Sequence, residues 1–319
     1  MFAKGVLPDT VIRDPRAEGL LVLATLDPAL EPAGVRAWLT QVEALIRRLI
    51  APLNGVPVAR VAVALGRSFF FAGEAARFGL DERAPLGLRE PPTFEAEDRL
   101  QDSDVLFYLM TTSEAVSVEF LDGLSQTRPI GLRRLEVERG FQRADAREMF
   151  GFLDGLRNVP FHERFRTVFV NREVTADEPA WTEDGTYLAY MKIEQDLDLW
   201  RSISLEEQEQ IIGRRKGDGS RLDLPPATKA RSEPDFGSGV PSPGSHVRKV
   251  GPRGEHADLK IFRRGGALFQ RAPGWDTGRR PALRQLSGLA RPIRHDHEPL
   301  DDKPGLSARL RSGRRAVRA

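Results

Sequence analysis

One carboxylate stands between two glycines in the segment Gly151-Phe152-Leu153-Asp154-Gly155. Glycine adopts backbone conformations that other residues avoid, and it lets a bound group approach the main chain closely. Asp154 could therefore face a ligand, where a carboxylate can act as a general acid or base. The alternative is an ordinary turn, in which the aspartate bonds its own backbone. The segment alone is compatible with both interpretations.

Further polar motifs follow this segment along the chain. In order they are Gly185-Thr186-Tyr187-Leu188, Ile212-Gly213-Arg214-Arg215-Lys216, Ser245-His246-Val247-Arg248 and Ile261-Phe262-Arg263-Arg264-Gly265. Together with the segment around Asp154, their order and spacing resemble the dye-decolorizing peroxidases, a haem-dependent family. The resemblance covers roughly residues 10 to 270 and is strongest from residue 148 onward.

The resemblance implies that His246 is the proximal ligand of the iron of heme b (iron protoporphyrin IX). The chain has no cysteine, so a thiolate ligand is not available. His246 follows the Pro- and Gly-containing run 241–245 and is expected to open a strand. Without the resemblance, a surface histidine at the start of a strand is the simpler interpretation. The other four histidines, at positions 162, 256, 295 and 297, lie in polar loops or in the tail.

Peroxide cleavage on the other face of a haem requires a group that moves a proton and a positive charge beside the leaving oxygen. The resemblance assigns Asp154 to the first task. Arg263 suits the second, because a guanidinium stays charged and offers several donors. Arg264 is the runner-up, since neighbouring residues on a strand point to opposite faces and only one of the two can face the iron. The alternative for either is a solvated arginine at the end of a strand.

Several further residues are expected near the cofactor. Gly151 and Gly155 would allow it to approach the main chain. Arg214 and Arg248 could meet the haem propionates, although Arg214 could equally serve the end of its helix, where a cation complements the helix dipole. Asn158 stands where the family's turn usually carries an asparagine.

The resemblance predicts an enzyme, a haem-dependent peroxidase that reduces hydrogen peroxide and oxidises dyes, phenols or similar small one-electron donors. A second hypothesis is a haem-binding or haem-handling protein with little peroxidase turnover, which would need His246 but neither Asp154 nor Arg263. A third is a degenerate, inactive member of the family.

Composition limits compartment and partners. The N-terminus has no basic stretch followed by an apolar run, and no stretch of about eighteen apolar residues occurs. We therefore expect a cytoplasmic protein that does not enter a membrane. The net charge of +2 conceals a basic tail: residues 279–319 hold ten Arg and one Lys against three Asp and one Glu. That tail lacks aromatic residues, so nucleic-acid binding is not expected. Homo-oligomers are common in the family, and nothing in the chain specifies one.

Hydrophobic periodicity predicts an α+β protein with a duplicated ferredoxin-like fold, in two antiparallel four-stranded sheets with helices. The first half, residues 1–145, shows the order strand, helix, strand, strand, helix, strand. The strands are expected at 20–26, 58–65, 105–110 and 133–138, and the helices at 35–50 and, after Ser113, up to about residue 124.

The second half, residues 146–278, is expected to bind the haem. Alternation predicts a strand at 187–193, and Ser204 with Glu207 forms a capping box ahead of a helix that ends near Ile212. A long loop follows at 217–245, and short strands are expected at 246–250 and 259–263.

The third segment, residues 279–319, shows no pattern of a strand or an amphipathic helix, so we expect the last strand and helix of the second half to be lost or altered. Disorder is one explanation. A slip of the reading frame near Thr277 is the other, because one choice of codons shifted by one base would encode an apolar strand and the start of a helix. The coding DNA tests this hypothesis directly.

Overall fold

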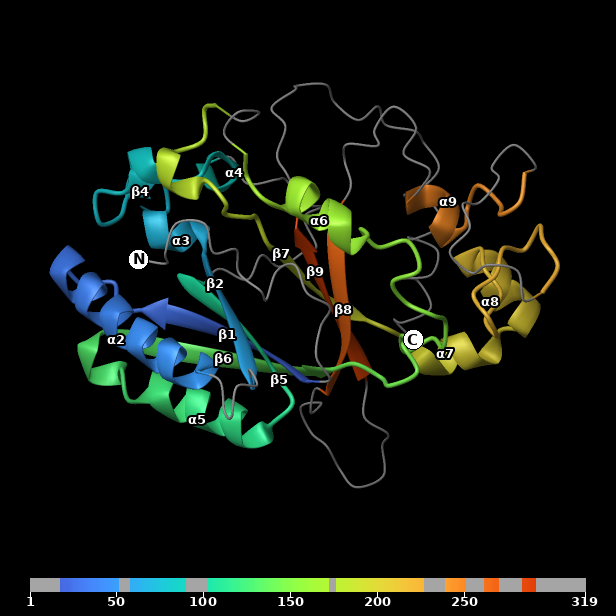
Figure 1. Ribbon diagram of the computed structural model, residues 1–319, viewed down its shortest axis with the longest axis horizontal. Helices are drawn as coiled ribbons and strands as arrows, with labels where there is room; N and C mark the ends of the chain where they lie inside the picture. The colour runs from blue at the N-terminus through green and yellow to red at the C-terminus, as the bar shows by residue number, and fades with distance from the viewer. Residues whose placement is uncertain are drawn as a thin grey trace, which may run out of the picture.

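The structure is a computed structural model (Figure 1). It describes residues 18–51, 58–89, 103–171, 176–226, 239–250, 261–269 and 283–290. The first half contains a four-stranded antiparallel part of the sheet with two long helices on one face (Figure 1). Its elements are β1 (Glu18–Leu26), α2 (Pro32–Ile50), β2 (Ala59–Leu65), β5 (Val105–Thr111), α5 (Glu114–Ser125) and β6 (Leu132–Phe141).

The strand order β2-β5-β1-β6 confirms the ferredoxin-like order predicted for this half. β1 is central, and its Val22 lies opposite Phe107 of β5 on one side and Val137 of β6 on the other. Short elements between β2 and β5 cover one end of the sheet. They are α3 (Arg67–Phe70), β3 (Phe71–Ala72), β4 (Ala75–Ala76), the 3-10 helix η1 (Asp81–Arg83) and α4 (Leu86–Arg89); the 3-10 helix η2 (Arg128–Ile130) precedes β6.

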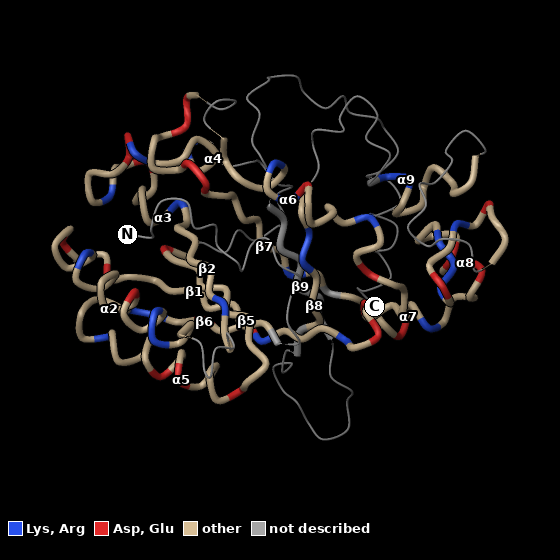
Figure 2. The backbone as a smooth tube through the Cα atoms, in the orientation of Figure 1, with Lys and Arg blue, Asp and Glu red and all other residues tan. Residues whose placement is uncertain are grey.

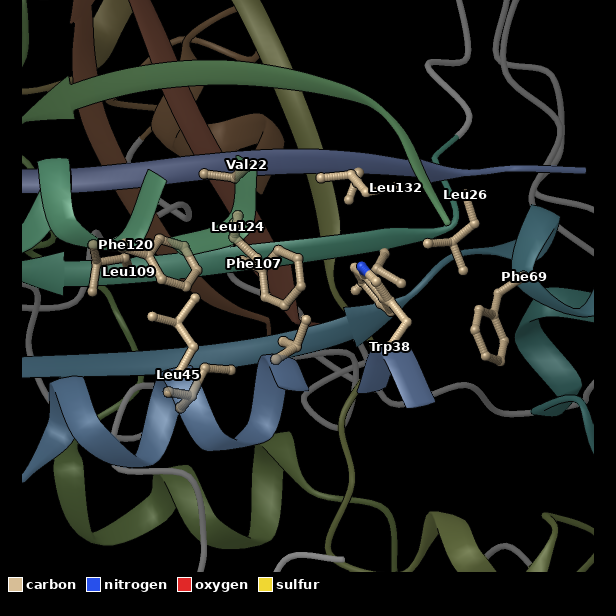
Figure 3. Close-up of a cluster of buried hydrophobic side chains, with 14 of the residues drawn as sticks. Val22, Leu26, Trp38, Leu45, Phe69, Phe107, Leu109, Phe120, Leu124 and Leu132 are labelled. Carbon is tan, nitrogen blue, oxygen red and sulfur yellow. The ribbon is translucent and has the colours of Figure 1, made fainter. Parts of the chain in front are cut away.

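The main hydrophobic core lies between this sheet and its two helices. Apolar residues of α2 recur at helical spacing, and Pro32 at its first turn suits a helix start. Trp38, Phe107 and Phe120 are fully buried and pack together (Figure 3). The indole Nε1 of Trp38 donates a hydrogen bond of 2.9 Å to Thr127 Oγ1, so the one polar atom of that ring is satisfied.

The second half adds three strands to the same sheet. In chain order its elements are α6 (Phe161–Val168), the 3-10 helix η3 (Ala180–Thr182), β7 (Ala189–Glu194), α7 (Leu197–Ser202), α8 (Leu205–Ile212), α9 (His246–Val250), β8 (Phe262–Phe269) and β9 (Leu283–Ala290). Seven of the described strands, drawn from both halves, form one antiparallel sheet in the order β2-β5-β1-β6-β8-β9-β7, and β3 and β4 form a separate two-stranded sheet. The α+β class is thus confirmed, and the two halves share a sheet instead of keeping separate ones.

The junction between the halves is short along the backbone. Among the described residues, β6 pairs with β8 through Gly140 with Leu268 and Phe141 with Ala267. Side chains extend the contact, because Tyr190 of β7 packs against Leu21 of β1. Lys192 of β7 forms a largely buried ion pair with Glu138 of β6.

The structure corrects the prediction of a strand at 246–250, since these residues form helix α9. The backbone N–H of Arg248 donates to the buried Ser245 Oγ (3.2 Å), which is the bond of a serine that caps a helix N-terminus. The second short strand, expected at 259–263, begins at Phe262 as β8; residues 259 and 260 lie outside the described residues.

The expectation that no strand follows residue 278 is wrong as well. β9 pairs with β8 along its whole length and with β7 over six residue pairs. Backbone hydrogen bonds to a neighbouring strand on each edge support β9. These bonds do not depend on the type of side chain, so the strand need not show an alternation of apolar and polar residues. The remainder of 279–319 lies outside the described residues, so disorder and the frame slip stay hypotheses.

Candidate functional site

A tight hairpin carries the Gly-flanked aspartate. The N–H of Asp154 donates to Ala146 O (2.9 Å), and the N–H of Glu148 donates to Phe152 O (3.0 Å). Gly151 closes the turn at φ +91°, in the left-handed region that favours glycine. Asp154 therefore leaves the hairpin at a position that the backbone fixes, as expected for an acid held in one place.

Glu148 organises the turn from inside. Its carboxylate accepts hydrogen bonds from the N–H groups of Phe150 (2.7 Å) and Phe152 (2.9 Å). Burial raises the pKa of Glu148, and the nearby charge of Asp154 acts in the same direction. Trp200 of α7 donates from Nε1 to Phe150 O (3.1 Å), and the two rings lie 4.3 Å apart. The hairpin is thus fixed to helix α7.

Arg147 ties the hairpin to the loop after α8. Its Nη1 donates to Gly151 O (2.7 Å) and Lys216 O (2.6 Å), and its Nη2 donates to Gly217 O (2.7 Å). Sequence reasoning missed both Arg147 and Glu148. No local pattern marks them, because their partners are backbone groups, some of them about seventy residues away.

We expect replacement of the two glycines around Asp154 by alanine to destabilise the protein by different amounts. Gly155 has φ +75° with open space around an added Cβ, so Gly155→Ala should lower the free energy of unfolding by about 1–2 kcal/mol, the cost of a left-handed L-residue. Gly151→Ala should cost more, because its Cβ would lie 2.8 Å from Lys216 Cε and Lys216 Nζ is bonded to Gln208.

Urea denaturation measures both changes. Gly217→Ala is the matched control, since Gly217 has no positive φ and an added Cβ there would meet no atom within 4 Å. Equal costs for all three variants would contradict the conformations assigned to the turn.

The structure brings Asp154 and Arg263 together. Arg263 Nη2 lies 4.0 Å from Asp154 Oδ1, and both side chains are about one third exposed or slightly more. The carboxylate also accepts a short hydrogen bond from its neighbour Gly155 N (2.7 Å). A pair this long and this solvated contributes little stability. Both groups consequently keep capacity for a ligand.

Arg264 points elsewhere. Its Nη1 lies 3.0 Å from Met110 Sδ, and its guanidinium lies 5.9 Å from the Tyr108 ring and 5.2 Å from the Phe262 ring. The two consecutive arginines, visible as the basic segment of β8 in Figure 2, thus lie on opposite faces of their strand. Of the two, Arg263 is the one beside Asp154.

His246 is the first residue of α9. The residue is exposed by surface area, yet desolvation by the surrounding protein lowers the pKa of its imidazole. The charge of Arg263 lowers this pKa further, and the charge of Asp154 raises it. The lowered pKa favours the neutral form of an accessible imidazole near both groups, and a neutral imidazole has the chemistry of a metal ligand.

These opposed charges predict a test in the protein without cofactor. We expect the His246 ring to titrate below 6.5 in an NMR pH titration; Arg263→Gln should raise that pKa, and Asp154→Asn should lower it further. The neutral form is favoured in the folded state, so stability from this group is lost as the pH falls below 6.5. Shifts of the same sign in both variants would contradict the arrangement.

The two arginines expected to contact the haem propionates differ from each other in burial. Arg214 is buried, 3% exposed, and donates to Gly219 O (3.0 Å) within its own loop. Arg248 is partly exposed on α9, two residues after His246, and donates to Pro241 O (3.3 Å). The cofactor contact predicted for either arginine stays a prediction.

The donor set fits a haem. A haem iron needs only one protein ligand, and a neutral histidine serves. Among the described ranges, no group of three or more His, Cys, Asp or Glu could hold a bare metal ion. A carboxylate and a guanidinium lie together near the imidazole, as a peroxide site requires.

Comparisons with known proteins show which family the chain resembles. Residues 145–278 match the family model described as Dyp-type peroxidase, C-terminal. A deferrochelatase from Escherichia coli O157:H7 is 27% identical over 227 residues, which cover 66% of this chain and 52% of the relative. A dye-decolorizing peroxidase from Thermobifida fusca is 27% identical over 240 residues, covering 70% and 54%. The chain thus spans about half the length of these curated relatives.

The fold has solved counterparts. A DyP-type peroxidase from Streptomyces coelicolor superimposes with a TM-score of 0.74 at 26% identity, covering 91% of this chain and 83% of the other. The match extends well beyond the second half, so the similarity includes the shared sheet.

Proposed function

Because this chain belongs to the DyP-type peroxidase family, we propose that it is a haem-dependent peroxidase. It would reduce hydrogen peroxide and oxidise dyes, phenols or similar one-electron donors. The single observation that carries this proposal is the placement of Asp154 4.0 Å from Arg263, with His246 close enough for both charges to shift its pKa.

Each residue would have a distinct task. His246 would bind the iron of heme b through its neutral ring, and the bound haem would supply the two electrons that reduce peroxide and then accept electrons singly from the donor. Asp154 would take the proton from one peroxide oxygen and return it to the other. Arg263 would stabilise the negative charge that develops on the leaving oxygen as the O–O bond breaks, so that water departs.

Other residues would hold the cofactor. Gly151 and Gly155 lie on either side of Asp154, and neither places a Cβ between the backbone and a bound ring. Arg248 is better suited than Arg214 to meet a propionate, because Arg214 is buried in its own loop. Arg263 is preferred over Arg264 because Arg264 contacts Met110 on the other face of β8.

A second candidate function rests on the deferrochelatase relatives. In that case the chain would bind haem through His246 and handle it with little peroxide turnover. Asp154 and Arg263 would then be dispensable. The two functions differ in what happens when the carboxylate is removed.

Compartment and partners belong to the same proposal. Within the described part of the chain, no helix has the length and apolar character that crossing a bilayer requires. We propose a cytoplasmic protein whose partners are hydrogen peroxide and a small reductant, with homo-oligomers as in other members of the family.

Reconstitution tests the proposal. The purified protein should acquire a Soret band with added haemin, and peroxide should then change that spectrum and drive oxidation of a phenol or dye. A haem complex that is inert to peroxide would support the haem-handling function. A folded protein that stays colourless in excess haemin would leave the degenerate, inactive alternative.

A further inference from the structure

The backbone of Arg263 is held by a side chain from the aspartate turn. Asn158 Nδ2 donates to Arg263 O (2.7 Å), and Asn158 Oδ1 accepts from Arg263 N (3.0 Å). The carboxamide therefore bonds both backbone polar groups of one residue, as the facing residue does in an antiparallel strand pair. Asparagine suits this task because its side chain has a donor and an acceptor.

The two hydrogen bonds from Asn158 take the place of a neighbouring strand at one edge of β8. Every second residue of a strand directs its backbone groups to the same edge. On this edge Ala267 pairs with Phe141 of β6, Gly265 O accepts from the Gln142 side chain (3.2 Å), and Arg263 is bonded to Asn158. Side-chain amides thus continue the ladder where the short β6–β8 pairing ends.

The same asparagine is fixed within the turn that carries Asp154. Its N–H donates to Gly155 O (3.1 Å), and its Oδ1 also accepts from Val159 N (3.0 Å). Arg164 of α6 adds a second link, because its Nε donates to Val159 O (3.0 Å) and its guanidinium lies 4.4 Å from the Phe262 ring. The turn and the start of β8 are therefore joined at adjacent points.

We propose that Asn158 is a positioning residue that sets the separation between the Asp154 carboxylate and the Arg263 guanidinium. Its carboxamide is bonded to the backbone of Arg263, so its proposed action on the reaction is through Arg263. Its role in turnover rests on the proposed peroxidase function, whereas its effect on the Arg263 backbone does not. Proton transfer and charge stabilisation both depend on placement within about 1 Å, and a displacement of that size can reduce a rate by about 100-fold.

The first test uses hydrogen exchange in the protein without haem. Asn158→Ala removes the acceptor of the Arg263 N–H, so exchange of that amide should accelerate by about tenfold or more. Gln142→Ala is the matched control, because Gln142 bonds the same edge of β8 two residues away but accepts no amide proton of Arg263. Its effect on the Arg263 amide should stay within about twofold.

The second test measures peroxide reactivity of the haem complexes. Asn158→Ala should slow the reaction with peroxide by about 10- to 100-fold and leave the KM for the reducing donor unchanged. Gln142→Ala should retain the native rate. A purely structural role would instead lower the yield of folded protein with a native rate per bound haem.

The outcomes separate the two proposals. Unchanged exchange at Arg263 in Asn158→Ala, or faster exchange with a native peroxide rate, would overturn the positioning role. A wild-type haem complex that does not react with peroxide would overturn the peroxidase function alone, since the exchange result does not depend on it. Should Asn158→Ala fail to fold, Asn158→Asp replaces it: a carboxylate oxygen would then face Arg263 O in place of the donor and repel it, so Arg263 exchange should accelerate and the peroxide rate should fall. Native exchange at Arg263 or a native peroxide rate in Asn158→Asp would overturn the positioning role.

Discussion

His246→Ala should abolish the Soret band that the protein acquires with haemin, whereas His162→Ala should leave it unchanged. His246 is the histidine whose pKa responds to the charges of Asp154 and Arg263, and desolvation by the surrounding protein lowers that pKa, which favours the neutral form that binds iron. Without an axial ligand, haem affinity should fall by at least about 100-fold, comparable with or greater than the loss caused by mutating residues that support a metal ligand.

The control is matched in residue type. His162 lies on α6 with its side chain 80% exposed and 3.6 Å from Glu163, so its removal alters only the surface. Absorption spectroscopy during a haemin titration measures the affinity of each variant. Retention of the native Soret position and affinity by His246→Ala would refute ligation by this residue, and with it the assignment of the whole site.

Asp154→Asn should reduce the rate of reaction with peroxide by about 100- to 10,000-fold, the usual contribution of a general acid or base. Haem affinity should not change, because Asp154 lies beside Arg263 and the proposed iron ligand is His246. The amide keeps the size of the side chain and can still accept the bond from Gly155 N, so the turn should persist. Stopped-flow mixing of the haem complex with peroxide gives the rate.

Asp145→Asn is the control for this variant. Asp145 precedes the same hairpin, is exposed, and forms an ion pair with Arg143 that lowers its pKa to about 2. Its replacement should leave peroxide reactivity intact. If Asp154→Asn also reacts at the native rate, the general acid–base assignment fails and the haem-handling function becomes the better explanation.

The first half of the fold could be predicted closely from the sequence. β1, β2, β5 and β6 lie within a few residues of the expected strands, and α2 and α5 correspond to the expected helices. These elements bury one face against a common core, so their apolar residues recur with the period of a strand or a helix. The capping serine of α8 was also visible, because its partner Glu207 N is three residues away.

The errors fall where no such period exists. Residues 246–250 are too few to show the spacing of apolar residues that marks a helix. In the structure, Ser245 accepts a hydrogen bond from Arg248 N and caps this helix at its N-terminus. β9 lies between two strands that are distant in sequence, so its backbone pairing could not be read from its own residues. In the described part of the chain, two backbone residue pairs and several side chains join the halves, and such a short junction gives no sequence signal from which the shared sheet could be predicted.

The sequence by itself determined the types of group at the site: an aspartate on a glycine-flanked turn, a histidine in place of any thiolate, and two adjacent arginines. Only the tertiary structure decided that Arg263 and not Arg264 lies beside Asp154, and that Asn158, Glu148 and Arg147 hold the turn. The physical reason is that the chemistry of a side chain depends on its residue type alone. Which side chains lie beside one another depends on strand register and on hydrogen bonds to backbone groups as far as 105 residues away, and these leave no pattern in the sequence.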